Sequence, residues 1–102
     1  MLGEHRRIVW APSAQRDLSD VWHYYAYDAS LDIADGLVRD IANVAERLSD
    51  EATIWRSRDE VAPGLRSVPA HPFTLFYRLA KDTVHIVRVV HERRDLTTVF
   101  SK

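Results

Sequence analysis

Cysteine is absent from this 102-residue sequence, and glycine, proline and methionine are scarce. Without cysteine, the chain can form neither a disulfide framework nor a thiolate metal site. Its three glycines form no phosphate-binding loop, and its five histidines fall into no compact ligand spacing. We therefore expect no metal ion, no cofactor and no nucleophile of the cysteine or serine-elbow type.

Long apolar runs are also absent, and none approaches the roughly 18 residues that a membrane-spanning helix needs. The net charge is −1 and the isoelectric point is near 6.5, which argues against general coating of nucleic acid. Hydrophobic residues make up 46% of the chain and charged residues 28%, as in ordinary globular proteins. We expect one cytoplasmic domain over residues 1–102, with no membrane partner and no sequence-specific nucleic-acid binding.

Charge is divided unevenly along the chain. Residues 11–51 carry nine acidic side chains against three arginines, whereas residues 52–102 carry nine basic side chains against five acidic ones. In the basic half, an apolar stretch runs directly into His91, Arg93 and Arg94. Together with Arg66 and Arg88, these residues predict a cationic rim on a sheet that suits an acidic partner. An ordinary solvated surface is the alternative interpretation of such charge blocks.

Hydrophobic periodicity predicts the secondary structure. A strand at 8–10 ends before Pro12, and a helix follows over about 12–27. Ser30 or Asp32 caps a second helix, whose apolar stripe runs from Ile33 to Leu48. Residues 50–63 have no steady period and predict a loop with room for one turn. Strands are predicted at 65–68, 73–79 and 84–90, and the last reads as a central strand covered on both faces.

The predicted order is β-α-α-β-β-β, an α+β domain in which a helical hairpin packs on one face of a small, mainly antiparallel sheet. Such a small sheet cannot bury all the apolar side chains of the hairpin and the loop that follows it. An exposed apolar surface surrounded by charged residues is typical of a protein interface. The residues that we assign to this partner surface are Tyr24, Tyr25, Tyr27, Val38, Ile54 and Trp55, although Trp55 could instead cap the core.

Four motifs occur in order along nearly the whole chain: Ala11-Pro-Ser-Ala14 with Asp17-Leu18 and Trp22, Gly64-Leu-Arg66, Leu75-Phe-Tyr-Arg78, and Ile86-Val-Arg-Val-Val-His91 with Arg94-Asp95. In order and spacing they resemble the ParE branch of the RelE/ParE toxin superfamily. The resemblance implies a toxin of a bacterial type II toxin–antitoxin pair with the RelE/ParE-like fold. It also implies an antitoxin whose C-terminal segment folds on the toxin. ParE-type toxins act on DNA gyrase, and RelE-type toxins cleave messenger RNA on the ribosome.

The residues at the RelE catalytic positions favour the ParE branch. In RelE-like enzymes, to which this chain is compared, the catalytic residues are lysines on the second strand, an arginine on the third, and an arginine with a tyrosine near the C-terminus. The matching positions here hold Leu65, Ser67, Thr74 and Phe100. Only Arg93 or Arg94 is retained, and one arginine cannot stabilise the developing phosphate charge and also move the proton.

We therefore expect a toxin without catalytic residues that binds gyrase through the cationic rim and a ParD-like antitoxin through the hairpin. The alternatives are a ribosome-dependent endoribonuclease and a non-toxic module that only binds antitoxin. Structural roles are also open for the arginines. Arg66 and Arg78 could pair with helix acids such as Asp17, and Arg88 could be hydrogen-bonded within the fold.

Overall fold

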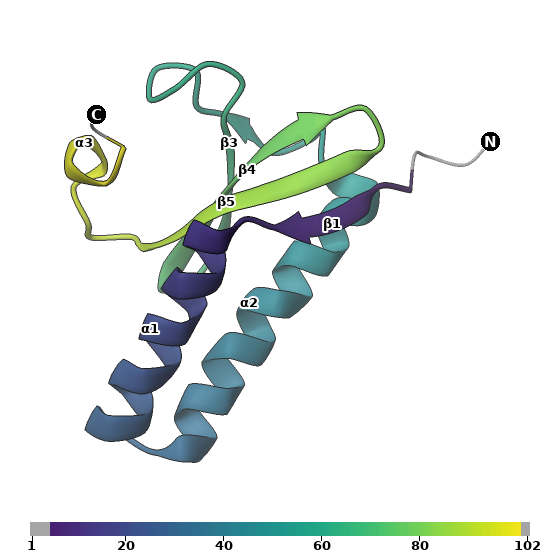
Figure 1. Cartoon of the computed structure of the whole chain (residues 1–102). Helices are drawn as coiled ribbons and strands as arrows, with labels where there is room; N and C mark the ends of the chain where they lie inside the picture. Colours follow the sequence, from purple (N-terminus) through teal and green to yellow (C-terminus); the bar gives the residue numbers. More distant parts are fainter. Residues whose placement is uncertain (1–4, 101–102) are drawn as a thin grey trace.

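A computed structural model of the chain describes residues 5–100, which form a helical hairpin and a five-stranded sheet (Figure 1). The elements are β1 (Arg7–Trp10), α1 (Pro12–Asp28), α2 (Leu31–Glu51), β2 (Arg56–Ser57), β3 (Arg66–Ala70), β4 (Phe73–Ala80), β5 (Thr83–His91) and α3 (Leu96–Val99). The predicted α+β class and the order of the long elements are confirmed. Two short elements were not predicted: β2 lies in the segment expected to be a loop, and α3 is a single turn near the C-terminus.

The ends of the two long helices follow from local sequence. Pro12 occupies the first turn of α1, where its missing N–H leaves no hydrogen bond unmade. Ser30 caps α2, because its hydroxyl accepts a hydrogen bond from the N–H of Ile33 at 3.1 Å. Of the two predicted caps, Ser30 is therefore the one used, and Asp32 lies in the first turn, where the helix dipole favours a carboxylate.

The sheet has the strand order β1-β5-β4-β3-β2. The pairing of β1 with β5 is parallel, and the other three pairings are antiparallel. Between Phe76 and Tyr77 the register of β4 against β5 shifts, since Phe76 is opposite Arg88 and Tyr77 is opposite Ile86. This bulge changes the alternation of side chains along β5, and it brings Arg88 to the face that carries Phe76.

Both faces of the sheet are covered, which confirms the prediction for β5. The main core lies between the hairpin and the sheet and includes Ile86 and Val89 of β5. On the opposite face, Val90 joins Leu65 and Phe76 in a second cluster, against which α3 and Phe100 pack. The hairpin continues past the sheet, so that its connecting turn lies well away from the strands (Figure 1).

Two features are absent from the part of the chain that the structure describes. No helix is both long and apolar enough to cross a membrane. Within the same residues 5–100, no group of three or more histidine, aspartate and glutamate side chains is placed to hold a metal ion.

Candidate interaction surfaces

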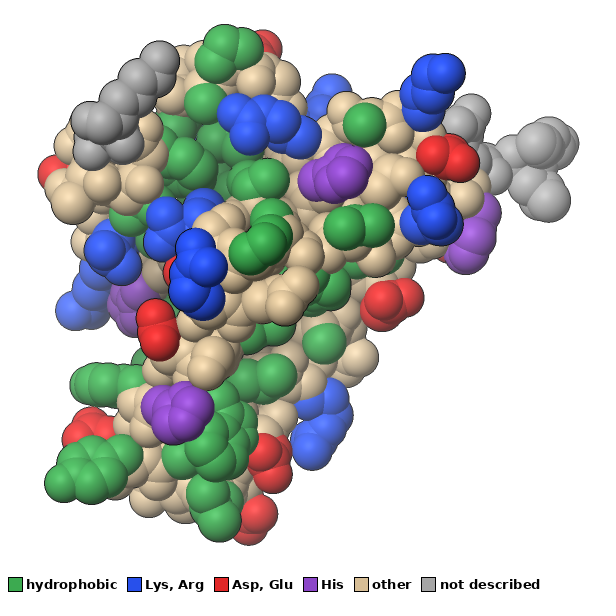
Figure 2. Space-filling view, in the orientation of Figure 1, with side chains coloured by type: hydrophobic (Ala, Val, Ile, Leu, Met, Phe, Trp, Pro, Cys, Tyr) green, Lys and Arg blue, Asp and Glu red, His purple; other side chains and the backbone are tan. Residues whose placement is uncertain are grey.

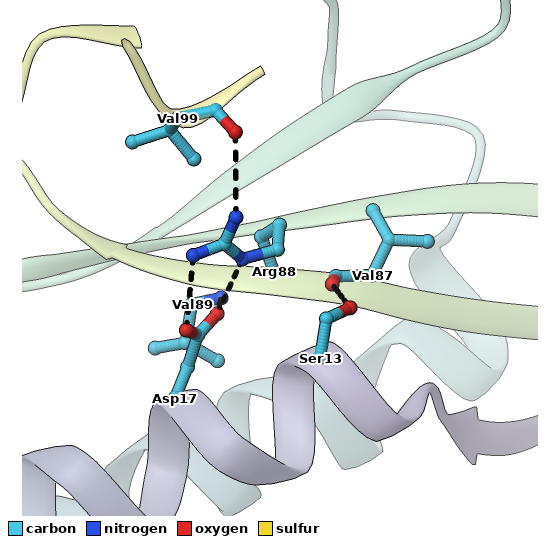
Figure 3. Close-up of polar contacts among 6 residues, drawn as sticks. All are labelled: Ser13, Asp17, Val87, Arg88, Val89 and Val99. Atoms are coloured by element: carbon cyan, nitrogen blue, oxygen red, sulfur yellow. Dashed lines mark hydrogen bonds and ion pairs between the residues drawn. The ribbon is translucent and has the colours of Figure 1, made fainter. Parts of the chain in front are cut away.

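Arg88, a predicted target-binding residue, forms an ion pair with Asp17 of α1 (Figure 3). Its Nε and Nη2 atoms donate to the two carboxylate oxygens of Asp17 at 2.8 and 3.1 Å, and Nη1 donates to the carbonyl oxygen of Val99 at 3.4 Å. The hydrogen bonds to Asp17 raise the pKa of Arg88 above its already high ordinary value. Arg88 therefore joins α1, β5 and the C-terminal segment, and only 25% of its side chain is exposed.

Ser13 and Asp17 also complete the hydrogen bonding of β5 where β1 ends. The pairing of β1 with β5 stops at Ile86. Just beyond it, the hydroxyl of Ser13 donates to the carbonyl oxygen of Val87 at 2.7 Å, and the carboxylate of Asp17 accepts from the N–H of Val89 at 2.8 Å. Ser13 and Asp17 are one helical turn apart and lie on the same face of α1. Polar side chains of a helix thus replace the missing edge strand.

Arg66 lies apart from the other residues of the predicted rim. Its Nη1 donates to the carbonyl oxygen of Trp55 at 2.8 Å, which ties the segment after α2 to β3. Arg66 is opposite Tyr77 of β4, whereas His91 is opposite Phe73. These positions are four residues apart along β4, or about 13 Å at about 3.3 Å per residue. Arg66 therefore lies beside the middle of β4, whereas His91 lies beside its first residue.

His91, Arg93 and Arg94 stay together where β5 ends. The N–H of Arg93 donates to Nδ1 of His91 at 3.1 Å, and the N–H of Arg94 donates to the carbonyl oxygen of His91 at 2.9 Å. The nearby carboxylate of Asp95 caps α3 instead, because the hydroxyl and the N–H of Thr97 donate to it and lower its pKa. Both arginines are exposed, and neither forms an ion pair within residues 5–100.

The free end of the hairpin exposes large apolar side chains. Tyr27 is 94% exposed and Tyr24 is 60% exposed, and both were assigned to the partner surface. Leu31 at 60% and Ile33 at 51% join them, although Leu31 was not predicted and Ile33 was placed on the apolar stripe of the second helix. Figure 2 shows hydrophobic and acidic side chains around this end, with most lysines and arginines gathered over the sheet.

The other residues assigned to the partner surface lie elsewhere. Tyr25, Val38 and Trp55 pack against the main core, where the ring of Tyr25 meets that of Phe73 edge-on at 6.3 Å between centroids. Ile54 is 70% exposed, but it follows the C-terminal end of α2, at the opposite end of that helix from the hairpin turn. Of the exposed residues assigned to the partner surface, Tyr24 and Tyr27 therefore lie toward the hairpin turn, and Ile54 does not.

A groove beside α1 joins members of the two predicted surfaces. It has a volume of about 390 Å³ and lies between α1, the first residue of β4 and the end of β5. Tyr24 and Tyr25 of the partner surface line it, as do His91 and Arg94 of the cationic rim. The remaining lining residues are Asp20, Val21 and Phe73.

On the face of the sheet away from the hairpin lies Arg58, which sequence reasoning did not select. Its Nε donates to Glu60 at 3.0 Å, its Nη1 donates to the hydroxyl of Ser67 at 3.3 Å, and its guanidinium carbon is 5.6 Å from the centroid of the Phe76 ring. Ser67 and Leu65, two of the positions compared with catalytic lysines, are buried. Arg58 is therefore paired and packed within the fold.

The sequence comparisons identify a family. Residues 8–96 match the family model described as ParE toxin of type II toxin-antitoxin system, parDE. Toxin ParE1 of Mycobacterium tuberculosis is 35% identical over 92 residues, which cover 88% of this chain and 93% of that protein. Toxin ParE3 of Caulobacter vibrioides is 27% identical over 96 residues, which cover 94% of this chain and 96% of that protein.

The comparisons with solved structures agree on the fold. A chain of the chromosomal ParDE system from P. aeruginosa is similar with a TM-score of 0.76 at 22% identity, covering 85% of this chain and 96% of that one. A chain of the toxin–antitoxin complex RelBE2 from Mycobacterium tuberculosis is similar with a TM-score of 0.65, also at 22% identity, covering 86% and 92%.

Proposed function

Because the chain belongs to the ParE toxins of type II toxin–antitoxin systems, we propose that it inhibits DNA gyrase by binding it and catalyses no reaction. A ParD-like antitoxin neutralises it in the cytoplasm by folding its C-terminal segment on the helical hairpin. The arrangement of the arginines favours inhibition by binding over cleavage of RNA.

The observation that carries the proposal is that two arginines near the sheet, Arg88 on β5 and Arg58 after β2, pair with carboxylates of the fold. Cleavage of RNA needs free cationic groups against the scissile phosphate and a group that moves the proton of the 2′-hydroxyl. Here Arg88 is held by Asp17 and Arg58 by Glu60. The cavity beside Arg58 has a volume of only about 110 Å³, whereas ligand pockets usually span about 300 Å³ or more. Binding to a target requires no such site.

We assign contact with the target to His91, Arg93 and Arg94. Both arginines are exposed just after the end of β5, and charge complementarity to an acidic protein surface would speed and orient the encounter. Arg66 and Arg88, first assigned to the same role, support this function indirectly, because they fix β3 and β5 to the rest of the fold.

We assign binding of the antitoxin to the exposed end of the hairpin. Tyr24, Tyr27 and Leu31 form an exposed apolar surface there, and Asp28 and Asp32 lie beside it at the hairpin turn. Such a surface fits an amphipathic segment with apolar and basic side chains, which orders itself on binding. The similarity to chains of the ParDE system and of the RelBE2 toxin–antitoxin complex supports an antitoxin as the partner.

The test is to run two assays side by side on the purified chain. Supercoiling by gyrase should be inhibited, and addition of the antitoxin should restore it. Messenger RNA on translating ribosomes should remain uncut, with a RelE-type enzyme as the positive control. RNA cleavage without gyrase inhibition would establish the endoribonuclease instead. Inactivity in both assays, with the antitoxin still bound, would identify a non-toxic antitoxin-binding module.

A further inference from the structure

We propose that the groove beside α1 receives an apolar side chain of the antitoxin with an acidic residue next to it. The antitoxin would thereby cover His91 and Arg94, which belong to the surface assigned to the target. This inference rests on the proposed function in requiring an antitoxin, but it does not depend on which target the toxin inhibits.

The walls of the groove suit an apolar side chain. Val21, Tyr24 and Tyr25 line the groove from α1, and Phe73 lines it from β4. The rings already pack edge-on, with centroids 5.0 Å apart for Tyr24 and Tyr25 and 6.3 Å apart for Tyr25 and Phe73. Its volume of about 390 Å³ falls within the range of about 300–1,000 Å³ that is usual for ligand pockets.

Charges at the groove define the polar part of the ligand. Arg94 lines it, and the guanidinium has no ion-pair partner within residues 5–100. His91 adds a donor, because Nδ1 accepts from the N–H of Arg93 and the proton of the neutral ring is then on Nε2. A carboxylate beside the apolar anchor would bind both groups. Asp20 of α1 also lines the groove, and its carboxylate would bind a hydrogen-bond donor or a basic side chain elsewhere in the antitoxin segment.

Continuity with the hairpin surface identifies the antitoxin as the occupant. Tyr24 lines the groove and is also 60% exposed, and Tyr27 lies one helical turn further on the same face of α1. A segment that covers Tyr27 and Tyr24 and continues toward the sheet therefore enters this groove. Its acidic residue then pairs with Arg94, so that the antitoxin occludes target-binding residues directly and needs no change in the fold of the toxin.

Two adjacent arginines provide a matched test. Arg94 lines the groove and Arg93 does not, although both are exposed and close in sequence. The probe is the antitoxin obtained by co-expression of this chain with the adjacent reading frame, then separated and titrated back by calorimetry. We expect R94A to weaken binding of the antitoxin by about tenfold or more, as for loss of a hydrogen bond to a charged group, and R93A to change it less than about threefold.

A charge swap identifies the acidic partner. In the R94E background, each Asp and Glu of the toxin-binding segment of the antitoxin is changed to Lys in turn. One such change should recover most of the lost affinity, and the same change should weaken binding to the wild-type toxin. Equal melting temperatures of the free R93A, R94A and R94E variants would exclude loss of fold as the cause.

The outcomes separate this inference from the proposed function. Equal antitoxin affinities of R93A and R94A would overturn the groove assignment, even if gyrase is inhibited and the antitoxin relieves it. If R94A lost gyrase inhibition and kept full antitoxin affinity, the groove would belong to the target, and the inference would also be wrong. A tenfold difference between the variants in a chain that leaves gyrase active would support the groove and refute the gyrase proposal.

Discussion

Asp17 and Arg88, 71 residues apart in sequence, form a two-pronged ion pair at the point where β5 loses its parallel neighbour β1. The same carboxylate accepts the N–H of Val89, so that one side chain of α1 satisfies both a guanidinium and an edge of the sheet. Arg88 in turn reaches the C-terminal segment through the carbonyl oxygen of Val99. This pair therefore connects the hairpin, the sheet and the segment that covers the sheet's other face.

Removal of Asp17 should destabilise the fold. In D17A, the guanidinium of Arg88 and the N–H of Val89 lose their partner, and the unfolding free energy should fall by about 2 kcal/mol. This loss is smaller than the roughly 3–5 kcal/mol cost of breaking a fully buried pair, because 25% of the Arg88 side chain is exposed to solvent. Chemical denaturation measures the change. D20A, one turn along the same helix at an exposed position, is the control and should change stability by less than about 0.5 kcal/mol. Equal stability of D17A and D20A would show that the pair is not structural.

Tyr77 should make the stability of the fold sensitive to alkaline pH. Burial raises the pKa of Tyr77 to about 12, and its hydroxyl donates to the carbonyl oxygen of Ala52 at 2.7 Å. Because the folded-state pKa lies above the ordinary value of 10.0, the neutral hydroxyl stabilises the fold fully below pH 10. That contribution is lost as the pH rises from about 10 through about 12.

The comparison with Y77F tests this pH dependence. At pH 8 the variant should be less stable by about 1 kcal/mol, since the carbonyl of Ala52 loses its donor. Urea unfolding at a series of pH values should then show the difference shrinking as the pH climbs above about 10, because Phe has no proton to lose. A difference that stays constant up to pH 12 would show that the hydroxyl of Tyr77 does not ionise differently in the folded state.

Helical and strand periodicity predicted the long elements because apolar residues recur at regular spacing along most of each of them. The stripe of α2 illustrates where this reasoning ends: Ile41 and Leu48 are buried, but Ile33 is 51% exposed. The next residue, Ala34, is fully buried, and Val38 packs against the main core, so the buried stripe of α2 begins at Ala34 and Ile33 lies beside it. The two-residue strand β2 and the one-turn helix α3 are too short to show any period.

The candidate surfaces were harder to predict, because an arginine in a strand looks the same whether it binds a partner or an internal carboxylate. Arg88 has apolar neighbours in sequence, and nothing local indicates that Asp17 lies across from it. The groove likewise depends on tertiary contact, since it brings Tyr24 beside the turn that follows β5. Sequence reasoning identified His91 and Arg94 as functional candidates but could not show that they share a groove with Tyr24.

Arg93 should contribute to toxicity and not to neutralisation. It is exposed, forms no ion pair within residues 5–100 and does not line the groove. In R93A, loss of one cationic contact should raise the concentration needed for half-inhibition of supercoiling by about tenfold, or about 1.4 kcal/mol. Calorimetry should give the wild-type affinity for the antitoxin. R47A removes an exposed arginine of α2 and should leave both measurements unchanged. A wild-type inhibition curve for R93A would remove this residue from the target surface.

Tyr27 and Tyr25, two residues apart on α1, should respond oppositely to the same substitution. Tyr27 is 94% exposed, so Y27E should leave the melting temperature of the free toxin nearly unchanged. The antitoxin complex of Y27E should be weaker by about tenfold or more, because a carboxylate would replace an aromatic contact in an already acidic surface. Y25E should instead lower the melting temperature of the free toxin, since its side chain packs on Phe73 and the main core, where a charge is costly.

Melting curves of both variants, free and with antitoxin, distinguish the two roles. A partner that binds only the folded toxin raises its stability by roughly 4 kcal/mol at a thousand times the dissociation constant, and Y27E should lose part of that gain at the same antitoxin concentration. If the free Y27E toxin melted as low as Y25E, Tyr27 would be part of the core and not of an interface. If Y27E gained as much from the antitoxin as the wild type does, the antitoxin would have to bind elsewhere, and the exposed hairpin end would need another partner.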